Sequence, residues 1–113
     1  MATPGEIRNQ LLRDLRGARA QLMSAEWLSM IREASKPQKK SAAESLMKIQ
    51  LALLDLENEA LATFRDDLAA NEDDIVASTQ NMRSALDRLQ STTKVLQAVT
   101  NFLGVVARIV TLF

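Results

Sequence analysis

Residues 95–113, VLQAVTNFLGVVARIVTLF, constrain the fold of this chain more than any other stretch. Thirteen of these nineteen side chains are apolar, and one, Arg108, is charged. Contiguous apolar surface of this size is rarely left open to water, so another surface should cover it. The cover could be the protein itself, a second copy, another protein or a lipid bilayer.

The apolar pattern of this stretch begins well before residue 95. Apolar residues and threonines recur at alternating intervals of four and three residues, which is the heptad pattern of a packed helix. They are Ile75, Thr79, Met82, Leu86, Leu89, Thr93, Leu96, Thr100, Leu103, Ala107 and Val110. Asn71 and the three acidic residues after it favour a helix start. We therefore predict one long helix over residues 72–113, with an apolar face that widens in an extension over residues 95–113.

Two further helices are expected before residue 72. Thr3, Pro4 and Glu6 combine a cap, a first-turn proline and a capping box, so the first helix should run over residues 4–35. Pro37 should end it, because proline disfavours helical geometry in the preceding residue. A second capping box at residues 41–44 predicts the next helix over residues 42–70.

Composition and charge assign these helices to one fold class. The chain has 3 glycines and 2 prolines in 113 residues, too few turn signals for a β-sandwich or barrel. Residues 1–40 carry eight basic and four acidic side chains, residues 41–74 two and nine, and residues 75–113 four and one. We predict a single all-α domain over residues 1–113, an antiparallel (up-down-up) three-helix, coiled-coil-like bundle with an extended amphipathic third helix. At ~1.5 Å per residue, residues 102–113 should project about 15–18 Å beyond the bundle.

Several classes of function are not expected from this composition. The chain has no Cys, His or Tyr, and we predict no catalytic residues, no metal site and no cofactor. Its net charge is zero and it lacks a basic stripe with interleaved aromatics, so neither nucleic acid nor a small-molecule substrate is an expected partner. Charged residues from Glu6 to Asp14 interrupt the N-terminus, so we expect no signal peptide and a cytoplasmic location, possible membrane association aside.

The sequence favours a non-enzymatic helical protein–protein interaction or assembly module that acts through its C-terminal helix. The partner would be a second copy, giving a homo-oligomer, or a protein for which the chain is adaptor, chaperone or neutralising partner, a format common among small bacterial proteins. The predicted interface comprises Leu96, Val99, Phe102, Leu103, Val106, Ile109, Val110 and Phe113, with Trp27 and Ile31 beside its base. Lys36, Lys39 and Lys40 would assist electrostatically.

Two alternatives to this interface remain open. In the first, the chain is a peripheral or tail-anchored membrane protein that uses residues 95–113 together with the basic loop at residues 36–40. In the second, the helix breaks near residues 101–104 and its last turn folds back over Trp27 and Ile31.

Overall fold

The computed structural model describes residues 2–89 and 91–110, and that part of the chain contains six helices and no strand. The predicted all-α class is confirmed, but the three long helices are replaced by six shorter ones. They are α1 (Pro4–Leu22), α2 (Ala25–Arg32), α3 (Lys36–Asn58), α4 (Leu61–Ala70), α5 (Glu72–Arg88) and α6 (Thr92–Val106).

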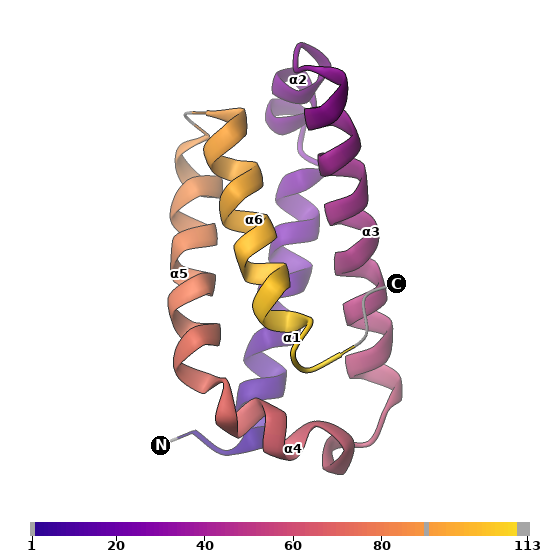
Figure 1. Cartoon of the computed structure of the whole chain (residues 1–113), viewed down its shortest axis with the longest axis vertical. Coiled ribbons are helices and arrows are strands. Elements are labelled where there is room, and N and C mark those ends of the chain that lie inside the picture. Colours follow the sequence, from indigo (N-terminus) through magenta and orange to yellow (C-terminus); the bar gives the residue numbers. More distant parts are fainter. Residues whose placement is uncertain (1, 90, 111–113) are drawn as a thin grey trace.

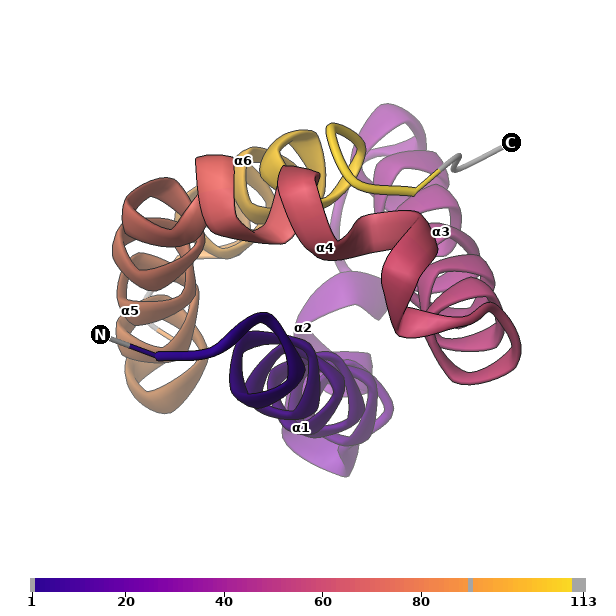
Figure 2. The ribbon, with the colours of Figure 1, turned by 90° about the horizontal axis from the view of Figure 1, so that it is seen from below.

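Four of these helices, α1, α3, α5 and α6, lie along the long axis of the molecule (Figure 1). They run up, down, up and down in chain order. The helix α1 packs against α3 and α5, and α6 packs against the same two helices from the other side. In the view from below, α3 and α5 are therefore diagonal neighbours (Figure 2), and α4 crosses the lower end between them. The short helix α2 lies at the upper end between α1 and α3.

The first predicted helix, residues 4–35, is divided into α1 and α2. The capping box of Thr3 and Glu6 is present at the start of α1. Ser24 adopts an extended conformation and its side chain accepts a hydrogen bond from Trp27 N at 3.3 Å, which caps a new helix. This change of direction buries the Trp27 side chain to 1% exposure. Burial removes a large apolar area of the tryptophan from water, and this gain offsets the helical hydrogen bonds lost at the break.

The second predicted helix, residues 42–70, also has different limits. Ser35 and Gln38 form the capping box, so Pro37 lies in the first turn of α3 instead of ending the helix before it. Proline is favoured in the first turn of a helix, because backbone N–H groups there have no acceptor within the helix and proline has no N–H to satisfy. The helix α3 ends at Asn58, and α4 follows after two residues. Without this break, α3 could not connect to the diagonally placed α5.

The third predicted helix, residues 72–113, is broken at Leu89 into α5 and α6. Leu89 has φ 46° and ψ 37°, the left-handed conformation that commonly ends a helix. Ser91 is extended and its hydroxyl accepts a hydrogen bond from Lys94 N at 3.4 Å, capping α6. The chain therefore reverses, and α6 packs antiparallel along α5.

This reversal removes the predicted projection for residues 102–110, the part of residues 102–113 that the structure describes. The described part of the molecule is 43 Å along its longest axis, shorter than the ~60 Å of the predicted third helix. Arg108 donates to Asp74 at 2.7 Å and to Asn71 at 3.3 Å, so the residues after α6 meet the start of α5. Phe113 lies outside the described residues.

Candidate functional site

The residues predicted as a partner interface lie inside the core of the bundle. Seven of the eight C-terminal residues are between 0% and 7% exposed: Leu96, Val99, Phe102, Leu103, Val106, Ile109 and Val110. The eighth, Phe113, is outside the described residues. Trp27 is buried as well, and Ile31 is half-buried against the core. The expected projection is wrong for residues 102–110, because α6 packs against α3 and α5 and its apolar side chains are covered by them.

The wide apolar face of α6 explains this burial. Apolar side chains cover a wide arc of α6 and leave only a narrow exposed polar side, so the helix needs neighbours on two sides. It finds them in α5 and α3, which it contacts along its length. The alternative in which the last turn folds back over Trp27 and Ile31 is not what the structure shows: the break lies at Leu89 and not near residues 101–104, and Arg108 contacts the start of α5, at the end of the bundle opposite to α2.

The three predicted electrostatic helpers lie on the first two turns of α3. Lys36, Lys39 and Lys40 are all exposed. Gln38, between them, donates a hydrogen bond to Thr93 Oγ1 at 3.1 Å, so this segment is beside the beginning of α6. Residues 102–110 are at the opposite end of α6. The structure therefore separates the basic segment from residues 102–110, but leaves it beside Leu96, which lines one shallow pocket together with Pro37 and Gln38.

A groove of about 520 Å³ lies between α1 and α5. Asp14 lines it, and its side chain is only 2% exposed. Arg83 NH2 donates to Asp14 Oδ1 at 2.6 Å, and Gln10 Nε2 donates to the same oxygen at 3.0 Å. Sequence reasoning missed this contact. The signal was available, because Asp14 falls three residues after Leu11 and four before Ala18, on the apolar face of α1.

The chemistry of this groove is that of a structural contact. Its one buried carboxylate is already held by a guanidinium and an amide, which leaves it poorly placed to act as a base. Thr79 Oγ1 is buried in the same wall and has no hydrogen-bond partner among the described residues. It is also inaccessible to a ligand, since less than 1 Å² of this atom is exposed.

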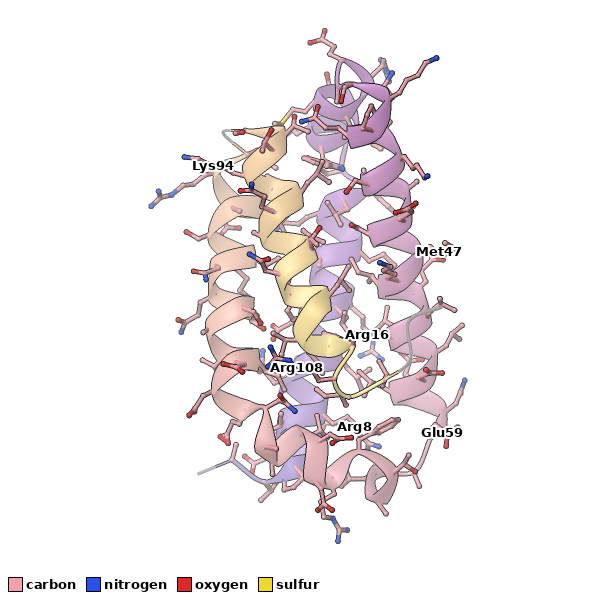
Figure 3. The ribbon with its side chains drawn as sticks, viewed as in Figure 1. Arg8, Arg16, Met47, Glu59, Lys94 and Arg108 are labelled. Atoms are coloured by element: carbon pink, nitrogen blue, oxygen red, sulfur yellow. The ribbon has the colours of Figure 1, made fainter. Side chains whose placement is uncertain are left out.

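The outer face of α3 carries apolar side chains that the core does not cover. Met47 is 57% exposed and Leu54, seven residues later, is 55% exposed. Figure 3 shows Met47 on the outer edge of α3, away from the other helices. Ala43 is exposed and Leu51 half-buried, so the apolar positions 43, 47, 51 and 54 form a stripe along this face. We call these four residues the α3 stripe.

The other exposed large apolar residues of the described chain are scattered. Met23 and Leu28 lie at the upper end, before and within α2, and Val76 lies on α5. Only the α3 stripe repeats at helical spacing, which is the pattern of a helix that packs against another helix. None of the four residues of the α3 stripe was among the residues predicted from the sequence as a partner interface.

The described part of the chain contains neither a cluster of metal-ligating side chains nor a helix that could span a membrane. No group of three or more His, Cys, Asp or Glu side chains there could hold a metal ion. None of the helices within residues 2–89 and 91–110 is long and apolar enough to cross a bilayer. No protein-family model, curated protein or solved structure matches this chain.

Proposed function

We propose that this chain is a non-enzymatic helical interaction module and that its partner binds the outer face of α3. The observation that carries the proposal is the α3 stripe, where Met47 and Leu54 are more than half exposed at a spacing of two helical turns. A helix in a stable bundle needs one apolar face. The helix α3 has two, of which the inner one, Ile49, Ala52, Leu53 and Leu56, already packs in the core.

The role of α6 in this proposal is to complete the bundle. Its apolar side chains form the wall against which α3 and α5 rest, and they remain unavailable to a partner while the bundle is folded. A rigid bundle is a suitable support for a binding surface, because it presents α3 in a fixed conformation and reduces the entropy lost on binding.

Crosslinking at single positions tests this proposal. A photo-crosslinking phenylalanine analogue is placed at position 47, 54 or 76 in cells that express the protein. Positions 47 and 54 should give the same discrete adduct. Position 76 is the matched control, because Val76 is 51% exposed but lies on α5. Equal adducts at all three positions, or none at 47 and 54, would contradict a binding face on α3.

A second candidate function is binding to an anionic membrane surface. It is favoured by the upper end of the molecule, where Met23 and Leu28 are exposed near α2 and the basic residues at 36, 39 and 40 begin α3. Apolar side chains beside lysines are the combination that binds anionic headgroups. Flotation with vesicles containing anionic lipid tests it, and Met23→Asp with Leu28→Asp should abolish flotation. If the unmodified protein stays at the bottom of the gradient, this function is excluded.

A further inference from the structure

The charges on α3 are arranged against the dipole of that helix. Its first turn has no acidic residue and its last turn no basic one. Residues 36–48 contain four lysines and one glutamate, whereas residues 49–59 contain three acidic residues and no basic one. Cations near a helix N-terminus and anions near its C-terminus both destabilise an isolated helix. An antiparallel helix with the same charge order would place acidic side chains beside the lysines at the N-terminus of α3 and lysines beside the acidic residues at its C-terminus.

The bundle itself corrects only part of this arrangement. Arg16 of α1 contacts Glu57 at 2.7 Å, and Glu44 lies 3.9 Å from Lys40 Nζ. Lys48 and Glu59 are exposed and Asp55 is half-buried, and no salt bridge within the described residues involves any of them. These charges flank the α3 stripe, where a partner helix would lie.

We propose that the occupant of the α3 stripe is α3 of a second copy, paired antiparallel about a two-fold axis. This inference rests on the proposed function and names its partner. An axis between residues 50 and 51 places Met47 opposite Leu54 of the second copy, twice in the dimer. The apolar contact is thus self-complementary, as an isologous interface requires.

The same axis brings opposite charges together. Two antiparallel helices present the same flank to each other, so Lys48 of one copy lies level with Asp55 of the other, within about 3 Å along the axis. Lys40 similarly lies level with Glu59 of the other copy. A parallel pairing would instead place lysines next to lysines and acids next to acids. Charge complementarity therefore selects the antiparallel dimer.

The mass of the intact chain in solution is the first test. Sedimentation equilibrium from about 1 μM to about 1 mM should show a rise from the 12.5 kDa of one chain to twice that value. Met47→Asp should raise the dissociation constant at least about tenfold, because it places a carboxylate in the apolar contact. Val76→Asp is the matched control and should change it less than about twofold. Circular dichroism checks that each variant is folded.

A charge exchange tests the antiparallel register. Lys48→Asp and Asp55→Lys should each weaken the dimer severalfold, because each places like charges together. The double variant should recover most of the affinity, since both cross-dimer pairs are restored with reversed sign. A structural role of either residue within one chain would not produce this recovery. If the double variant is as weak as the single ones, the register is wrong.

Single cysteines provide an independent geometric test, because the natural chain contains none. Under mild oxidation, an equal mixture of Met47→Cys and Leu54→Cys chains should form mainly the mixed disulfide. A parallel dimer would instead favour the two symmetric products. A chain that stays monomeric at every concentration overturns the self-pairing. A photo-adduct at position 47 to a different protein would overturn it too, while supporting the proposed function.

Discussion

The helices α6 and α3 both carry more apolar surface than one neighbour can cover, but the molecule treats them differently. The apolar face of α6 is wide and continuous, and its side chains Val99, Phe102 and Val106 are completely buried. The second face of α3 is a narrow stripe on which Met47 and Leu54 remain more than half exposed. Burying an apolar side chain stabilises the fold by roughly 1.5–3 kcal/mol. The fold therefore gains most by burying α6, its most apolar helix. The smaller face is the one to which we propose that a partner binds.

The largest expected effect separates these two helices directly. Phe102→Ala should lower the free energy of unfolding by about 3–5 kcal/mol, because it leaves a cavity in the core. Met47→Ala, measured at low protein concentration, should change it by less than about 0.5 kcal/mol. Urea denaturation followed by circular dichroism measures both. Similar values for the two variants would show that α6 is not the core helix described here.

A smaller effect is expected where α1 meets α5. Arg83→Ala leaves the carboxylate of Asp14 buried with Gln10 as its only partner among the described residues. An unsatisfied buried group costs about 1–3 kcal/mol. Arg88→Ala, at the exposed end of the same helix, is the control and should have little effect. If Arg83→Ala changes the free energy of unfolding as little as Arg88→Ala does, water reaches Asp14 in the variant. The contact between α1 and α5 is then less tightly packed than the contacts of α6.

The start of α3 can be tested with two serines. Ser35→Ala removes the cap of the helix that carries the α3 stripe, and should cost about 1 kcal/mol. Ser41→Ala changes the residue that sequence reasoning selected as the cap, and should cost clearly less because this position is inside the helix. Thermal melts of the two variants compare them. If Ser41→Ala lowers the stability more than Ser35→Ala does, the helix begins at residue 42 and not at residue 36.

An effect of similar size but opposite sign is expected at Thr79. Thr79→Val keeps the shape of a buried side chain and removes a hydroxyl without a partner in the described structure. We expect stabilisation by roughly 1 kcal/mol. Thr100→Val, on the exposed side of α6, is the control and should be neutral. A destabilised Thr79→Val variant would indicate that the hydroxyl is bonded in solution.

Helix caps could be predicted from local sequence signals, whereas the break at Leu89 and the α3 stripe could not. The cap at Thr3 can be read from neighbouring residues alone, and so can the acidic first turn of α5. The break at Leu89 could not be found from periodicity, because the heptad pattern continues through it without a change of phase. Ser91 was the one available signal, as a capping residue inside an apparently continuous helix. The stripe on α3 was concealed by the stronger periodicity of its inner face.

The sequence by itself determined that this chain is helical, and that the apolar side chains of residues 95–113 need a cover. Both follow from properties that each residue carries locally: helix propensity, caps and the spacing of apolar side chains. Only the tertiary structure decided what provides the cover. A surface in the same chain is always close by, so α6 loses less entropy by folding back than by capturing a separate molecule. The left-handed conformation of Leu89 costs little free energy compared with the gain from burying α6. The folded state therefore contains the turn, and α6 packs into the bundle.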